Sequence, residues 1–126
     1  MKLIRSLFLT GFCIGLIGCA ANPESIAPAY VSYVTYQSWT CRQLAEEQSR
    51  LIAALSSASD AQRTARANDT MGVILLGLPV SSLSGSNQAS NVARLKGELD
   101  AVQKAMTVKG CSAKIIPASE AVQKKR

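Results

Sequence analysis

The segment "MGVILLGLPVSSLSG" (Met71–Gly85) lies halfway along the stretch of chain that separates Cys41 from Cys111. Between Val73 and Val80 it carries no polar side chain, whereas the sequence on either side is rich in alanine, serine and charged residues. It also contains three glycines, a proline and several serines, which are typical of turns. We therefore expect the chain to reverse its direction within this segment, near residue 76.

The stretch before the apolar segment is predicted to be a helix from about residue 40 to 70. Thr40 and Gln43 have the spacing of a capping box. No proline or glycine follows before Thr70, and good helix formers dominate. Residues that recur at spacings of three and four define one face of this helix: Leu44, Gln48, Leu51, Leu55, Ala58, Gln62, Ala65 and Asp69.

A second helix is predicted after the apolar segment. Its apolar residues follow the alternating spacing of a coiled-coil seam, and they are Val92, Leu95, Leu99, Val102 and Met106. The charged residues lie off that seam, namely Arg94, Lys96, Glu98, Asp100 and Lys104. Ser86 or Asn87 is expected to cap its start, and Gly110 suits the position just after its end.

Two helices folded back at residue 76 would bring Cys41 and Cys111 side by side. A disulfide closing a loop of this length contributes about 4 kcal/mol in the chain-entropy model. The predicted fold is therefore all-α: an antiparallel helical hairpin (residues 40–111) with a disulfide at its open end and an apolar tip (71–85). A flexible N-terminal tether and a C-terminal tail flank it. Two free thiols are the alternative to the disulfide.

The first residues indicate export. Lys2 and Arg5 precede an apolar run, Leu7–Gly18, which is too short to cross a bilayer and is typical of a signal peptide. The run ends in Leu-Ile-Gly-Cys, which resembles the lipobox of bacterial lipoproteins. The resemblance implies removal of residues 1–18 and acylation of Cys19. An ordinary signal peptide with an incidental cysteine is the alternative.

The residue after Cys19 is alanine, not the aspartate that commonly retains lipoproteins in the inner membrane. We therefore expect attachment to the outer membrane on its periplasmic face, with inner-membrane or surface-exposed location as alternatives. That compartment is oxidising, so the remaining pair, Cys41 and Cys111, is expected to be joined.

Two segments flank the predicted hairpin. Residues 19–39 contain two prolines and many small residues, and they are interpreted as a lipidated tether that ends in aromatic residues spaced three apart. Those aromatic residues, Tyr30, Tyr33, Tyr36 and Trp39, either form a collar on a membrane or partner, or cover the base of the domain. Residues 112–126 are interpreted as a basic tail that frays after Pro117.

The tip of the hairpin is the candidate interaction site. Exposed apolar residues that are contiguous usually mark a contact surface, and here they are Val73, Ile74, Leu75, Leu76, Leu78 and Val80. The alternative is that the tip folds back onto its own helices. Contact with a membrane, with a protein partner and with a second copy of the chain all fit an apolar tip.

Several short segments together resemble a group of small, uncharacterised bacterial lipoproteins. They are the lipobox, Cys41-Arg42-Gln43-Leu44, the apolar midsection, Ala93-Arg94-Leu95-Lys96-Gly97-Glu98, and Lys109-Gly110-Cys111. The resemblance extends over most of residues 41–111. It implies the paired cysteines and the two-helix plan, and it implies no activity.

Signatures of catalysis are missing from the sequence. The chain has no histidine, which removes the commonest general base and zinc ligand, and its carboxylates form no paired signature. The net charge of +6 would suggest nucleic acid in the cytosol, but not after export.

We therefore expect a non-enzymatic, lipid-anchored binding or structural component of an envelope assembly, without metal or cofactor. It would contact the membrane through its lipid anchor, and a protein partner or a second copy through its tip. A membrane-active or self-associating protein, or a small lipoprotein subunit of a secretion or transport machine, are the alternatives.

Overall fold

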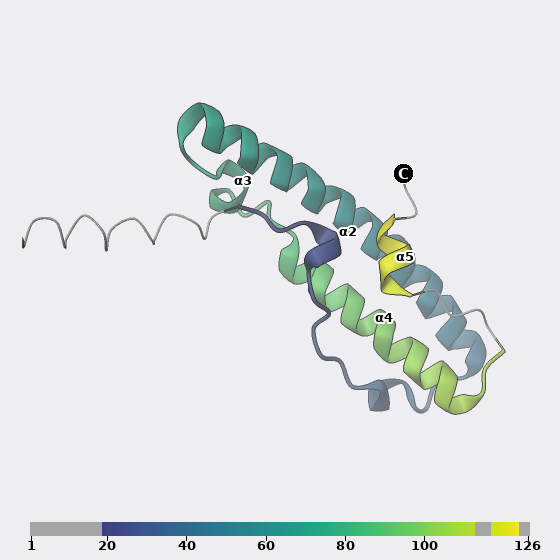
Figure 1. The fold of residues 1–126 in the computed structure, drawn as a ribbon. Helices are drawn as coiled ribbons and strands as arrows, with labels where there is room; N and C mark the ends of the chain where they lie inside the picture. The colour runs from purple at the N-terminus through teal and green to yellow at the C-terminus, as the bar shows by residue number, and fades with distance from the viewer. Residues whose placement is uncertain (1–18, 113–116, 124–126) are drawn as a thin grey trace, which may run out of the picture.

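The computed structural model describes residues 19–112 and 117–123, so the predicted signal peptide lies outside the described residues. Two short 3-10 helices, η2 (Pro23–Ser25) and η3 (Tyr33–Tyr36), precede the long helix α2 (Cys41–Leu76). A single helical turn, α3 (Val80–Leu83), leads to α4 (Ala89–Lys109), and the short helix α5 (Ala118–Gln123) follows. The described residues contain no strand, which confirms the all-α prediction (Figure 1).

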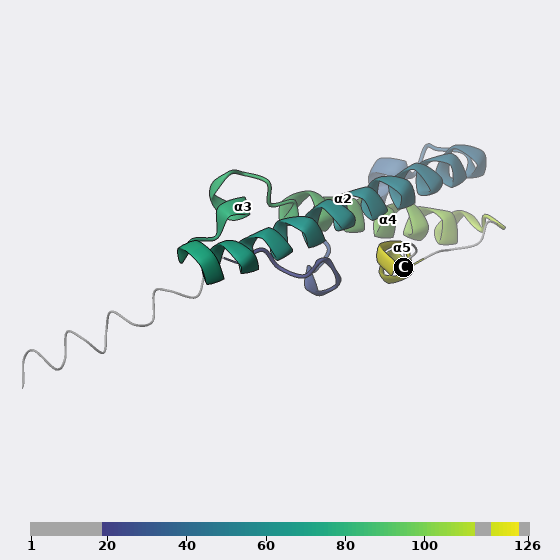
Figure 2. The ribbon, with the colours of Figure 1, turned by 90° about the horizontal axis from the view of Figure 1, so that it is seen from above.

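Helices α2 and α4 lie side by side and run in opposite directions, as Figures 1 and 2 both show. Every residue of the two predicted stripes is buried, from Leu44 to Asp69 on α2 and from Val92 to Met106 on α4. Apolar burial between the two helices is the main source of stability in such a pair. The helical hairpin is therefore confirmed, with its core where the periodicity indicated.

The predicted disulfide joins the open end of the hairpin. The sulfur atoms of Cys41 and Cys111 are 2.01 Å apart, and their Cα atoms are 5.6 Å apart. Cys41 is the first residue of α2, and Cys111 follows the C-cap of α4, Gly110, which has a positive φ of 69°. The disulfide thus fixes the first residue of one helix to the end of the other.

The N-terminal ends of the two long helices are capped by side chains within a few residues of each helix start. Thr40 and Gln43 form the expected capping box: the Thr40 Oγ1 accepts from the Gln43 N–H, and the Gln43 Oε1 accepts from the Thr40 N–H at 2.8 Å. At the start of α4, the Asn87 Oδ1 accepts from the Ala89 N–H at 3.0 Å. The N-cap of α4 is however Gln88, whose side chain makes no capping bond, so the prediction of Ser86 or Asn87 at that position is wrong by at least one residue, although Asn87 contacts the first helical residue.

The reversal of the chain differs in detail from the prediction. Helix α2 continues past Thr70 to Leu76, so half of the apolar segment is helical rather than part of a turn. Methionine, isoleucine and leucine tolerate helical geometry, and the helix ends only at Gly77, which adopts a φ of 72°. Helix α3 then packs back against α2 at Gly72, where a Cβ would overlap Val80.

The N-terminal segment also differs from an unattached tether. Residues 20–36, here called the strap, run along the hairpin from the α3 end toward the disulfide (Figure 1). The Ala29 N–H donates to the Ala93 carbonyl at 2.8 Å, and the Lys96 Nζ donates to the carbonyls of Pro23 and Ile26 at 2.7 and 2.6 Å. Pro23 begins the short helix η2, and the backbone of the strap finds hydrogen-bond partners on α4.

The aromatic residues at the end of the strap cover the base of the hairpin. Tyr36 is buried in the core, and Trp39 packs against it edge to face, with ring centroids 5.2 Å apart. Tyr33 is partly buried against the same core, whereas Tyr30 is exposed. Three of the four aromatic rings therefore cover the base of the domain, as one of the two interpretations expected, and only Tyr30 does not.

Residues 118–123 form a helix, so the prediction that the chain frays after Pro117 is wrong for this part of the tail. Helix α5 packs on α2, with Ala121 and Val122 buried, and the Arg63 guanidinium donates to the Val122 carbonyl at 2.8 Å. The sequence of α5 is too short to predict a stable isolated helix. Its stability comes from contact with α2, which no local pattern reveals.

Gly97 tests the packing of the strap. A Cβ at this position would overlap the carbonyl of Ala29, so Gly97→Ala should destabilise the fold by about 1–3 kcal/mol. Helix propensity alone predicts the opposite sign, a gain of about 0.5–1 kcal/mol. Urea denaturation decides between the two, with Lys104→Ala, at an exposed position of α4, as the control. A stabilised Gly97→Ala variant would show that the strap does not lie on α4.

Candidate functional site

The six predicted residues of the apolar tip all lie at the surface. Their exposed fractions run from 42% for Val73 to 72% for Ile74. Met71 and Leu83, at 59% and 69% exposed, extend the same surface onto the neighbouring turns of α2 and α3. These two residues are not among the six predicted contact residues, although both fall within residues 71–85. The tip therefore presents eight large apolar side chains at one end of the molecule.

A buried carboxylate lies directly beneath this surface. Asp69 is fully buried, and its Oδ1 accepts from the backbone N–H groups of Ser81 and Ser82, the latter at 3.1 Å. Its Oδ2 accepts from the Ser82 hydroxyl at 2.7 Å and from the Ala20 N–H at 3.0 Å. One side chain of α2 thus holds both α3 and the first residue of the strap.

The hydrogen bonds determine the charge of Asp69. Burial raises the pKa of this carboxyl, but donation from Ser82, Ala20 and Ser81 to the ionised form outweighs that effect and holds the pKa below its ordinary value. Asp69 is therefore a carboxylate at neutral pH. Its role is to accept from groups that would otherwise be buried without partners.

The predicted acylation site lies at the tip end of the hairpin. Cys19 is exposed and is not part of a disulfide. It directly precedes Ala20, which is buried and fixed to Asp69. Cys19 and the tip are therefore brought together, whereas the disulfide lies at the opposite end, about 50 Å away along α2.

Two further polar side chains fasten the strap. Gln62 donates to the Ala21 carbonyl at 2.9 Å and accepts from the Gln88 N–H at 2.6 Å. Lys96 is only 5% exposed, and burial lowers the pKa of its ammonium, which the carboxylates of Glu24 and Asp100 partly offset. Gln62 and Asp69 were visible as polar residues on a predicted buried stripe. Lys96 was not, because it lies off the seam of α4.

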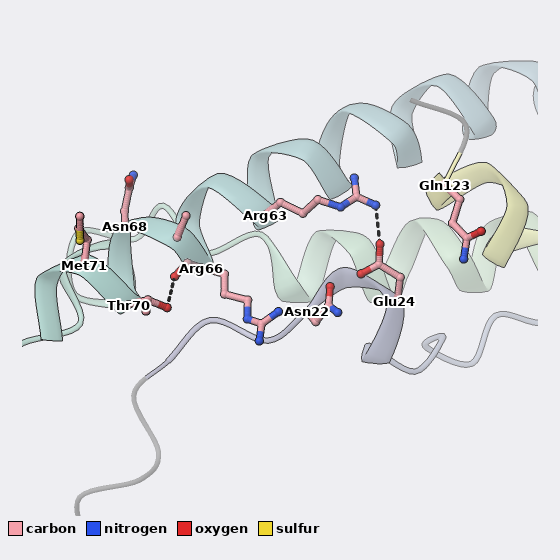
Figure 3. A pocket seen from close by; sticks show the side chains of 9 residues that line it. Asn22, Glu24, Arg63, Arg66, Asn68, Thr70, Met71 and Gln123 are labelled. Carbon is pink, nitrogen blue, oxygen red and sulfur yellow. Dashed lines mark hydrogen bonds and ion pairs between the residues drawn. The ribbon is translucent and has the colours of Figure 1, made fainter. Parts of the chain in front are cut away.

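Beside the strap, close to the tip, an open groove of about 970 Å³ is lined mainly by polar side chains (Figure 3). On its wall Arg63 pairs with Glu24 at 2.5 Å and with Asp60 at 2.9 Å. Arg66 extends toward Asn22 of the strap in the same view. Within the described residues Arg66 makes no ion pair, so its guanidinium is available to an anion at the surface.

Comparison with known proteins adds nothing to this geometry. The chain matches no protein-family model, no curated protein and no solved structure. The function must therefore be argued from its own residues.

Two properties of the described residues bear on the chemistry of this end of the molecule. None of their helices combines the length and the apolar character needed to span a bilayer. Nor do they bring together three side chains of the types that hold a metal ion. The features that the structure does supply here are an apolar surface, an exposed cysteine and an arginine.

Proposed function

We propose that this protein is a lipid-anchored lipoprotein of the bacterial envelope that acts by binding, as a structural or accessory component of an envelope assembly. The observation that carries the proposal is the exposed Cys19 one residue before the fixed end of the strap. An acyl anchor on this cysteine would be joined to the folded domain without a linker. Its alanine neighbour favours the outer membrane.

The polar interior of the molecule supports a binding role rather than a catalytic one. The buried polar side chains of Asp69, Gln62 and Lys96 could in principle take part in a reaction. All three make hydrogen bonds to the strap, and Asp69 also binds α3. Their hydrogen bonds join segments far apart in the sequence, so they contribute rigidity. A rigid hairpin with one apolar end suits a component that holds a fixed orientation.

The anchor is tested by Cys19→Ser. We expect this variant to lose incorporation of labelled palmitate and to accumulate as the precursor that retains residues 1–18, because the thiol is the acceptor of the lipid. Mass spectrometry and membrane fractionation measure both outcomes. Cys13→Ser is the matched control, since it removes a neighbouring thiol and should leave labelling and processing unchanged. Normal maturation of Cys19→Ser to a form free of membranes would refute the proposal.

A further inference from the structure

Resting on the proposed lipid anchor, we propose that the tip is a second membrane contact, which inserts into the surface of the same bilayer that holds the acyl chains. The hairpin would then stand on the membrane with its disulfide end directed away from it. The tip would be an interfacial contact and not a span, because Gly77 and Pro79 interrupt it and it is far shorter than the roughly 20 residues that a span requires.

The first argument is the position of the anchor. The N–H of Ala20 is held by Asp69, which also holds the backbone of α3 at Ser81 and Ser82. One residue covers at most about 3.6 Å of chain, so Cys19 cannot move far from this point. Acyl chains on Cys19 therefore bring the bilayer to the tip end of the hairpin, whatever else the tip contacts.

The second argument is the character of the surface at that end. The eight exposed apolar side chains, Met71, Val73, Ile74, Leu75, Leu76, Leu78, Val80 and Leu83, belong to the end of α2 and to the α3 turn, which Asp69 fastens together. An end of the molecule that exposes this many apolar side chains is unfavourable in water and favourable at the boundary of headgroups and acyl chains. Its position next to the anchor makes the bilayer the nearest apolar phase.

The third argument is charge. Between residues 61 and 92 the chain carries three charged side chains, Arg63, Arg66 and Asp69. Asp69 is buried, and the two carboxylates nearest this stretch, Glu24 and Asp60, are both paired with Arg63, at 2.5 and 2.9 Å. Arg66 lines the groove that also contains Asn22 and Met71, which places a cation between the strap and the apolar tip (Figure 3). An arginine that makes no ion pair among the described residues, beside an apolar surface, favours anionic headgroups over a second copy of the same end.

The test uses the chain's single tryptophan, Trp39, which lies beside the disulfide. The acylated protein is reconstituted into vesicles of phosphatidylethanolamine and phosphatidylglycerol whose acyl chains carry bromine, a short-range quencher. In the variant Leu76→Trp with Trp39→Phe, we expect strong quenching by brominated lipid. The wild-type protein, with Trp39 alone, should show none. The variant Val108→Trp with Trp39→Phe is the matched control, because Val108 is also an exposed apolar residue but lies near the disulfide end.

Every other outcome overturns the proposal. If the tryptophan introduced by Leu76→Trp is unquenched by lipid and remains accessible to acrylamide in solution, the tip faces water. If neither brominated lipid nor acrylamide quenches this tryptophan and crosslinking yields dimers, the tip contacts a second copy of the chain. Equal quenching of all three tryptophans would mean that the hairpin lies flat. Mass spectrometry of the same sample shows whether Cys19 carries lipid, so failure of the anchor is distinguished from failure of the tip contact.

Discussion

Replacing both Cys41 and Cys111 by serine is expected to lower the free energy of unfolding by about 4 kcal/mol. The disulfide closes a loop of 70 residues, which restricts the unfolded chain far more than the folded one. A two-helix domain buries little apolar surface, so this contribution is a large share of its total stability. The variant should be partly unfolded at 37 °C.

Urea denaturation of the oxidised protein, the reduced protein and the double serine variant measures this effect. Reduction and substitution should agree, because both remove the same loop constraint. All of these proteins are produced without residues 1–18, and Cys19→Ser serves as the control, since Cys19 is exposed and lies outside any disulfide in the structure. A loss of less than about 1 kcal/mol would mean that helix packing alone holds the two ends together.

Asp69→Ala is expected to have the largest effect of any single polar substitution. It leaves the N–H groups of Ala20, Ser81 and Ser82 without their acceptor in a buried position. Both the start of the strap and α3 should then separate from α2. We expect a lower Tm and faster amide hydrogen exchange at these three residues. Asp60→Ala is the control, because Asp60 pairs with Arg63 on a half-exposed surface, where an ion pair contributes little.

The same carboxylate gives the fold a dependence on pH. Because the folded state holds the pKa of Asp69 below its ordinary value of 3.8, its stabilising effect is complete above that pH. It is lost as the pH falls through the lower pKa of the folded state. The difference in Tm between wild type and Asp69→Ala should therefore shrink in strong acid. A difference that stays constant down to the lowest pH would contradict the assignment of these hydrogen bonds.

Local sequence predicted the hairpin because its signals act within a few residues. The stripes from Leu44 to Asp69 and from Val92 to Met106 follow from helical periodicity, and the caps at Thr40 and Gly110 follow from side-chain and backbone chemistry at one position. The disulfide followed from two cysteines placed symmetrically about the apolar segment. The exposure of the tip followed from the same symmetry.

The strap and α5 were not predictable in this way. Residues 20–36 contain two prolines, and the three-residue spacing of their tyrosines does not indicate which surface they cover. Their placement depends on partners at Ala93, Lys96 and Gly97. Helix α5 is similarly dependent on α2. Contacts of this kind join residues tens of positions apart, and neither member of the pair carries a local signal of the other.

By itself, then, the sequence determined the two helices, their buried faces, the cross-link at one end and the apolar character of the other. Only the tertiary structure decided that the chain after Cys19 runs back along the hairpin and is fastened at Asp69, which brings Cys19 close to the tip. The physical reason is the range of the forces involved. Periodic burial and capping act within single helices, whereas the buried carboxylate of Asp69 on α2 accepts from two other segments, the strap and α3.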